Sequence, residues 1–184
     1  MLPLGTELPS FSLPNLDGKA VADTDFVGAP ALVVAFVCPH CPYVTHIRGA
    51  FAQLAKDYQS QHVAFVAINA NDADAYPEDG PKGMTREAAS AGYTFPYLRD
   101  ESQAVAKAFR AACTPDLYVF DRGRRLVYRG QFDGTRPSRP GPATGADLRA
   151  ALDGVLAGRP GPVEQRPSVG CNIKWKPGRA PRYT

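Results

Sequence analysis

The chain has 184 residues, a hydrophobic fraction of 44% and a charged fraction of 21%, which are typical of a soluble globular protein with one domain of ordinary size. Its formal net charge of +3 is too small to indicate a nucleic-acid partner. The opening residues lack the basic segment and apolar run of a signal peptide, and the most apolar run, residues 29–37, is about half as long as a membrane span requires. We therefore expect a cytoplasmic protein that has no membrane partner.

The N-terminal part of the chain predicts a hairpin, a buried strand and a helix. Residues 11–22 surround an Asp17-Gly18 step, which is a strong turn signal for a hairpin. Residues 31–37 form a continuous Val-rich run, which suits a central strand buried on both faces. Apolar residues then recur at spacings of three and four, which predicts a helix with one apolar face. The residues of this face are Val44, Ile47, Phe51, Leu54 and Tyr58.

The middle of the chain predicts a further strand and two helices. Residues 63–68 form the next buried strand. The polar residues 69–82 form a loop that is long for a compact domain, which suggests a functional role. A helix is predicted over residues 84–91, and Asp100 is expected to cap the helix that follows, with Gln103 completing a capping box.

The C-terminal part predicts an antiparallel pair of strands and a last helix. Residues 117–120 and 125–130 form the pair, and residues 148–156 form the amphipathic helix. This order of elements predicts an α/β domain over residues 1–158, with a mixed central sheet flanked by helices. The N-terminal hairpin occupies about residues 1–28 of that domain.

The last residues, 159–184, predict a tail without a core of its own. They are basic and rich in Pro and Gly, so the tail must pack on or near the domain if it is to be ordered. Trp175, between Lys174 and Lys176, is expected to anchor the tail to the domain.

The segment Cys38-Pro39-His40-Cys41 lies where the buried strand ends and the first helix is predicted to begin. A helix N-terminus presents unpaired N–H groups and a partial positive charge, which stabilise a thiolate. We therefore expect Cys38 to have a lowered pKa and an exposed sulfur, and to be the attacking group. Cys41 would then resolve the mixed disulfide. Pro39 fits the first helical position, and the positive form of His40 would stabilise the thiolate further.

Two other interpretations of this cysteine pair are a structural zinc site and a pair of unconnected core cysteines. A structural zinc site requires a second ligand pair at similar spacing, and the sequence has none. The strand-to-helix setting of the C-x-x-C motif argues against unconnected core cysteines. The motif therefore indicates redox chemistry that needs no metal and no dissociable cofactor.

Short motifs that recur in one protein family are spread over nearly the whole chain. They are Pro9-x-Phe11-x-Leu13, Asp17-Gly18-Lys19, Cys38-x-x-Cys41-Pro42-Tyr43-Val44, residues 67–72, 76–79 and 95–98, Thr114-Pro115, and residues 170–175. With these motifs the chain resembles the thioredoxin superfamily, and more closely its peroxiredoxin-like redoxins of the alkyl hydroperoxide reductase/thiol-specific antioxidant group. The resemblance implies a thioredoxin fold. It also implies that the Thr114-Pro115 peptide bond is cis, lies against Cys38 and Cys41, and exposes the Thr114 backbone to a bound peptide.

The chain departs from that resemblance at two places. Thioredoxins carry a buried acid on the strand before the cysteine pair, whereas residues 31–37 contain no ionisable side chain. Peroxiredoxins carry a Pro-x-x-x-Thr/Ser-x-x-Cys pattern at the cysteine that attacks peroxide. Counting back from Cys41 places Cys38 at the Thr/Ser position and Val34 at the Pro position, and counting back from Cys38 gives Ala35 and Ala31. The pattern is absent at both cysteines, which argues against peroxidase activity.

Cys113 and Cys171 allow three interpretations. Both can be inert core residues. They can form a second disulfide that pins the tail across the site, or Cys171 can relay electrons. A third cysteine can also join Cys38 and Cys41 in a metal or iron–sulfur site.

The sequence thus predicts an enzyme of dithiol–disulfide exchange. Its partners would be a protein or small-molecule disulfide or thiol as the substrate, and a thiol reductant or oxidant. One alternative is a peroxiredoxin-like thiol peroxidase, in which Cys38 becomes a sulfenic acid and Cys41 closes the disulfide. A second alternative is a non-enzymatic redox sensor or binding module, for which Cys38 would be dispensable.

Overall fold

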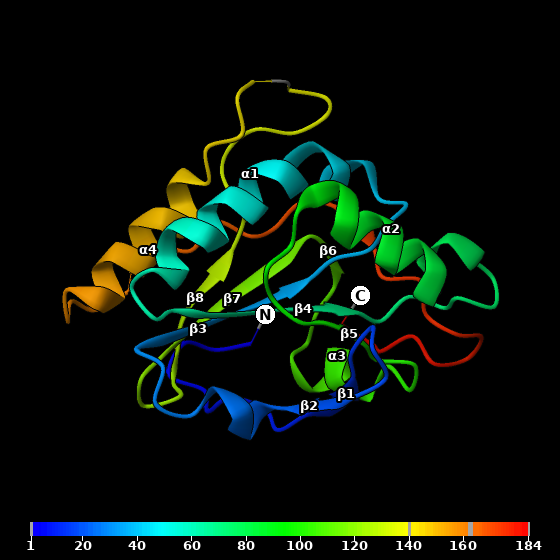
Figure 1. Cartoon of the computed structure of the whole chain (residues 1–184), viewed down its shortest axis with the longest axis horizontal. Helices are drawn as coiled ribbons and strands as arrows, with labels where there is room; N and C mark the ends of the chain where they lie inside the picture. Colours follow the sequence, from blue (N-terminus) through cyan, green and yellow to red (C-terminus); the bar gives the residue numbers. More distant parts are fainter. Residues whose placement is uncertain (1, 140, 162–163, 184) are drawn as a thin grey trace.

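Five strands form a central mixed sheet in the computed structural model, which describes residues 2–139, 141–161 and 164–183 (Figure 1). In spatial order the strands are β5 (Tyr97–Arg99), β4 (Ala64–Asn69), β3 (Ala31–Phe36), β7 (Asp116–Asp121) and β8 (Leu126–Gly130). β4 is parallel to β3 and to β5, whereas β7 is antiparallel to β3 and to β8. The predicted mixed sheet and its late antiparallel pair are confirmed.

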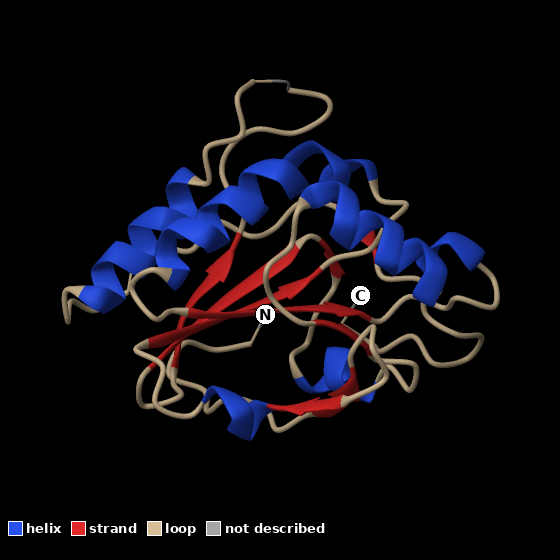
Figure 2. Ribbon diagram, in the orientation of Figure 1, coloured by secondary structure: helices blue, strands red, loops and turns tan. Residues whose placement is uncertain are grey.

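Helices and a hairpin cover the two faces of the sheet (Figure 2). The helices on one face are α1 (Pro42–Gln59), α2 (Pro81–Ala91) and α4 (Ala146–Leu156). The elements on the other face are the hairpin of β1 (Ser12–Pro14) and β2 (Ala20–Ala22), with the short helices η1 (Asp23–Phe26) and α3 (Ala104–Ala108). Among the described residues, no helix combines the length and the apolar character that crossing a bilayer requires.

The alternation of side chains along β3 divides the interior into two cores. Ala31, Val33 and Ala35 pack with the apolar face of α1, whereas the residues between them pack with the hairpin and α3. Every residue of β3 is 5% exposed or less. The prediction of a central strand buried on both faces is therefore confirmed, and this rigid strand positions the cysteine pair that follows it.

α3 begins later than the sequence predicts. The Asp100 carboxylate accepts a hydrogen bond from the Ala106 amide at 2.8 Å, so it caps the first turn of α3 as predicted, although Gln103 and not Asp100 is the residue immediately before the helix. Gln103 precedes the helix with a φ of 62°, and its side-chain amide donates to the carbonyl oxygens of Ala70 and Lys174. The predicted capping box is wrong because the Gln103 side chain binds the tail instead of the helix end.

The tail returns to the domain after α4. Its short strand β9 (Cys171–Asn172) pairs antiparallel with β6 (Cys113–Thr114). Further along, the Lys174 amide donates to the side-chain oxygen of Asn71 at 2.9 Å, and Trp175 packs against the core beneath the hairpin. The tail is therefore held by backbone pairing, by side-chain hydrogen bonds and by apolar contact.

Candidate active site

The turn that carries the two cysteines connects β3 to α1. Cys41 is the residue immediately before the helix, and Pro42 occupies the first helical position, where a missing N–H costs no hydrogen bond. Pro39 lies in the turn ahead of the helix. The prediction that Pro39 takes the first helical position is wrong, because Pro42 takes that position. As a result the N-terminus of α1 faces Cys41 and not Cys38.

Both cysteines are fully buried, with exposures of 0%, so the expectation of an exposed Cys38 sulfur is wrong. The hydrogen bond between the two thiols, and then burial, raise the pKa of Cys38 well above its ordinary value. The same hydrogen bond lowers the pKa of Cys41 to about 4, and the backbone amides of Cys171 and Val44 act in the same direction. The two sulfurs thus share one proton, and the neighbouring amides favour the negative charge on Cys41, whereas we expected it on Cys38.

Thr114 contacts both sulfurs. The Thr114-Pro115 peptide bond is cis, as the resemblance implies. Thr114 Oγ1 lies 3.4 Å from Cys38 Sγ, and the thiol form of Cys41 donates to the Thr114 carbonyl oxygen at 3.1 Å. The predicted position of Thr114-Pro115 against the cysteine pair is confirmed. Because each thiol can hold the shared proton, the two sulfurs titrate as a pair.

The backbone of Thr114 is already paired within the chain. Thr114 lies opposite Cys171 in the β6–β9 ladder and is 2% exposed. The expectation of an exposed Thr114 backbone is therefore wrong for this arrangement. The tail strand occupies the edge that an added peptide strand would use.

The polar segment after β4 holds His40. His40 Nδ1 lies 2.6 Å from Asp79 Oδ2, and the imidazole stacks on the Tyr76 ring with centroids 5.3 Å apart. Asn71 donates to the same Asp79 oxygen at 2.8 Å. The negative charge of Asp79 is one of the smaller causes that raise the pKa of Cys38, after the hydrogen bond to Cys41 and burial. His40 is thus oriented beside the cysteine pair by residues from another part of the chain.

Cys38, His40 and Asp79 also offer a possible metal-binding arrangement, because their potential ligand atoms lie within 4.8 Å of one another. A metal would have to replace the 2.6 Å hydrogen bond between His40 and Asp79 and the hydrogen bond of the Cys38 thiol to Cys41. Because these potential ligand atoms already have hydrogen-bond partners, we assign the three residues to the hydrogen-bond network of the thiol pair.

Asp79, Asn71 and Tyr76 were missed as site residues by the sequence analysis. The available signal was the length of the polar segment over residues 69–82. The structure divides that segment into a loop, the short helix η2 (Pro77–Asp79) and the beginning of α2. The length of the segment is explained by its contact with the site.

The other two cysteines lie on the paired strands β6 and β9. Burial raises the pKa of the Cys113 thiol, which donates to the Pro115 carbonyl oxygen at 3.5 Å. Cys171 is partly exposed and packs against the core cluster that contains Cys38 and Cys41. Burial, followed by the hydrogen bond with Cys41, raises the pKa of Cys171 to about 11. The structure thus brings Cys171 into hydrogen-bonding contact with the redox pair.

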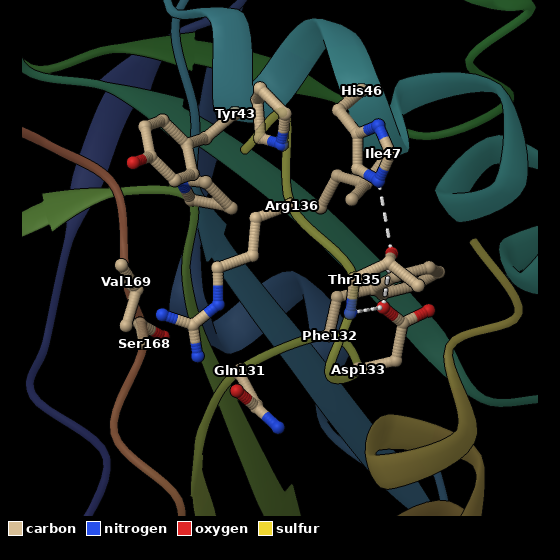
Figure 3. A pocket seen from close by; sticks show the side chains of 12 residues that line it. Tyr43, His46, Ile47, Gln131, Phe132, Asp133, Thr135, Arg136, Ser168 and Val169 are labelled. Atoms are coloured by element: carbon tan, nitrogen blue, oxygen red, sulfur yellow. Dashed lines mark hydrogen bonds between the residues drawn. The ribbon is translucent and has the colours of Figure 1, made fainter. Parts of the chain in front are cut away.

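A small surface depression lies beside the start of α1 and Pro115 (Figure 3). It is lined by side chains from α1, from the segment after β8 and from the tail. Figure 3 shows the Arg136 side chain extending between Tyr43 and Ser168. Because Tyr43 lies two residues after Cys41, and Pro115 directly follows Thr114, this depression adjoins the redox pair.

Comparisons with known proteins agree with the fold. The AhpC/TSA family model matches residues 4–129. The crystal structure of a hypothetical protein from Sinorhizobium meliloti 1021 is similar at 51% identity with a TM-score of 0.94, covering 97% of each chain. Peroxidoxin BcpB from Mycobacterium tuberculosis shares the fold, with a TM-score of 0.65 at 18% identity, covering 86% of this chain and 98% of that chain.

A curated relative is the chloroplastic peroxiredoxin Q of Suaeda salsa, which is 28% identical over 139 residues. The matched region is 70% of this chain and spans only 60% of the length of that relative. The family model, by contrast, covers well over half of this chain and includes the cysteine pair. From this match and from the fold, the chain belongs to the AhpC/TSA family of thioredoxin-fold redox proteins.

Proposed function

We propose that this protein catalyses thiol–disulfide exchange through Cys38 and Cys41. The observation that carries the proposal is the contact between the two thiols at the N-terminus of α1, where both also touch Thr114. Sulfurs in such contact can close a disulfide with little rearrangement. The substrate is a protein or small-molecule disulfide, and a thiol reductant returns the pair to the reduced state. The reaction needs no dissociable cofactor.

Since the backbone amides of Cys171 and Val44 donate to the Cys41 sulfur, we assign the attacking thiolate to Cys41 and the resolving thiol to Cys38. The Cys41 thiolate attacks one sulfur of the substrate disulfide, a Cys41–substrate bond forms, and the leaving sulfur takes up a proton. Cys38 then loses its proton and attacks Cys41 Sγ. The Cys38–Cys41 disulfide closes and the second substrate thiol is released. The substrate gains two electrons, and the protein dithiol loses two.

A substrate can reach the Cys41 sulfur only after a local opening of the structure, because Cys41 is fully buried. The tail covers it from one side, through β9 and the Cys171 amide that donates to the Cys41 sulfur. The depression beside Tyr43 and Pro115 offers a docking place next to that cover. Separation of β9 from β6 would also free the Thr114 backbone for pairing with a peptide substrate.

A second candidate function is a thiol peroxidase, which the match to the AhpC/TSA family and the likeness to peroxiredoxin Q favour. In that reaction a cysteine thiolate attacks the peroxide O–O bond and becomes a sulfenic acid, while the other oxygen leaves as an alcohol or water. The partner thiol then closes the disulfide and releases water. Both functions use the same two sulfurs, so they differ in the oxidant.

The test compares the wild-type protein with the Cys38→Ser, Cys41→Ser and Cys113→Ala variants, using glutathione disulfide and hydrogen peroxide as alternative oxidants. We expect Cys41→Ser to lower the rate of glutathione disulfide reduction by at least about 1,000-fold, because the attacking thiolate is gone. Cys38→Ser should still form the mixed disulfide at Cys41 but fail to close the Cys38–Cys41 disulfide. Cys113→Ala should leave the rate unchanged.

Full exchange activity in Cys41→Ser would contradict the proposal. Rapid consumption of peroxide by wild type, without reduction of glutathione disulfide, would identify a peroxidase instead. If both Cys38→Ser and Cys41→Ser kept the protein's interactions with its partners, the non-enzymatic sensor or binding module would be supported.

A further inference from the structure

The tail strand β9 lies where its cysteine can meet the redox pair. In the β6–β9 ladder Cys171 is opposite Thr114, and Asn172 is opposite Cys113. Gly170 makes this approach possible, because a Cβ atom at that position would lie 2.0 Å from the Thr114 carbonyl oxygen. The register of the tail is therefore set by backbone pairing and by a glycine that no larger residue can replace without displacing the strand.

The pairing directs Cys171 towards Cys41 and not towards Cys113. Residues opposite each other on paired strands project from the same face of the ladder, and successive residues project from opposite faces. Cys171 therefore shares a face with Thr114, which contacts both sulfurs of the pair, whereas Cys113 projects from the other face. Cys171 also packs against the core cluster that contains Cys38 and Cys41, and its amide and thiol interact with the Cys41 sulfur.

We propose that Cys171 is a third redox thiol of this site and forms a disulfide with Cys41 in alternation with Cys38. This inference rests on the proposed exchange function. Cys41 is common to both pairings, since it interacts with Cys38 and with Cys171, and all three residues belong to or pack against one core cluster. Of these three residues only Cys171 is partly exposed, so it connects the buried pair to the surface.

The step is an internal exchange that needs no added oxidant. Starting from the Cys38–Cys41 disulfide, the Cys171 thiol loses its proton and attacks Cys41 Sγ. The Cys41–Cys171 bond forms as the Cys38–Cys41 bond breaks. Cys38 leaves as a thiolate and takes up one proton, so protons and electrons balance. The product is a disulfide that ties the tail to the site and is nearer to the surface, where a thiol reductant can reach it.

The experiment is peptide mapping by mass spectrometry, under non-reducing conditions, of the full chain oxidised with glutathione disulfide. In the Cys38→Ser variant we expect one intramolecular product, the Cys41–Cys171 disulfide. The Cys38→Ser/Cys113→Ala double variant should give the same linked peptide, and Cys38→Ser/Cys171→Ser should lose it completely and retain glutathione on Cys41. The wild-type chain should show both disulfides in a glutathione redox buffer. This result does not depend on whether the variants fold.

Other outcomes would overturn the inference. Glutathione retained on Cys41 of Cys38→Ser while Cys171 stays reduced, together with an exclusively Cys38–Cys41 disulfide in wild type, would show that Cys171 takes no part. A Cys113–Cys171 disulfide would also contradict it. Exchange activity distinguishes this failure from failure of the proposed function, because the exchange proposal fails if Cys41→Ser remains active or if wild type does not reduce glutathione disulfide, whatever Cys171 does.

Discussion

Replacing Asp116 with alanine is expected to lower the free energy of unfolding by about 3–5 kcal/mol, because it breaks a buried ion pair by removing one partner. Asp116 is 1% exposed and accepts hydrogen bonds at 3.0 Å from both Arg129 Nη2 and the Tyr118 hydroxyl. Arg129 is 5% exposed, and its Nε and Nη1 atoms have no partner among the described residues. Without Asp116 the guanidinium would be a buried charge with no counter-ion. Urea denaturation followed by circular dichroism measures the loss.

Two variants make this test specific. Asp57→Ala removes an exposed carboxylate that pairs with Arg149 on the surface, and should leave the unfolding midpoint unchanged. Asp116→Leu/Arg129→Met replaces both charges with apolar groups and should recover most of the lost stability. If Asp116→Ala behaved like Asp57→Ala, the buried pair would have no structural importance.

The position of Asp116 adds a functional consequence. It directly follows Pro115, and its carboxylate also accepts a hydrogen bond from the Ala112 amide at 3.3 Å. The carboxylate therefore holds both ends of the turn that presents Thr114 to the two cysteines. We expect Asp116→Ala to slow disulfide exchange even under conditions in which the protein remains folded.

Those parts of the fold that depend on local patterns were predictable from the sequence. The Val-rich run that became β3 and the apolar stripe of α1 are signals carried by neighbouring residues, and tertiary packing reinforces both. The Asp17-Gly18 turn is local in the same sense. The start of α1 was misplaced because the motif contains two prolines that each suit the first helical position, and only packing decides between Pro39 and Pro42.

The missed parts of the site all involve contacts between distant segments. His40 and Asp79 are 39 residues apart in the sequence, and no periodic pattern connects them. Strand β9 has only two residues, too few to produce a recognisable alternation, so its pairing with β6 could not be read from the tail. The burial of Cys38 and the contacts of both cysteines with Thr114 follow from long-range contacts of this type, whereas the lowered pKa of Cys41 comes first from the neighbouring Cys38.

Glu87 is a further residue that the sequence does not connect with the site. It supplies a buried acid that the strand before the cysteine pair lacks. It lies on α2, is 3% exposed, and accepts a hydrogen bond from the Tyr97 hydroxyl at 2.8 Å. The same hydroxyl lies 3.5 Å from the carbonyl oxygen of Val37, the residue before Cys38. Burial raises the pKa of Glu87 to about 7, and the charge of Cys41 acts in the same direction. An acid from a helix thus couples electrostatically to the thiol pair.

This raised pKa determines how stability depends on pH. Between its ordinary pKa of 4.5 and about 7, Glu87 holds its proton in the folded protein and loses it in the unfolded chain. The folded state therefore binds more protons, so the contribution of Glu87 to stability falls as the pH rises through this window. Glu87→Gln keeps the shape and cannot ionise. We expect the variant to be more stable than wild type by up to about 3 kcal/mol at pH 8, and by almost nothing at pH 4.

Urea denaturation of wild type and Glu87→Gln at both pH values checks this difference, with Glu101→Gln as the control because the Glu101 side chain is 60% exposed. An equal gain at pH 4 and pH 8 would attribute the effect to packing and not to ionisation. The redox state provides an independent test. Closing a disulfide removes the negative charge at Cys41 that helps to raise the pKa of Glu87. The gain from Glu87→Gln at pH 8 should therefore be smaller in the oxidised protein, because coupling between two charges is reciprocal.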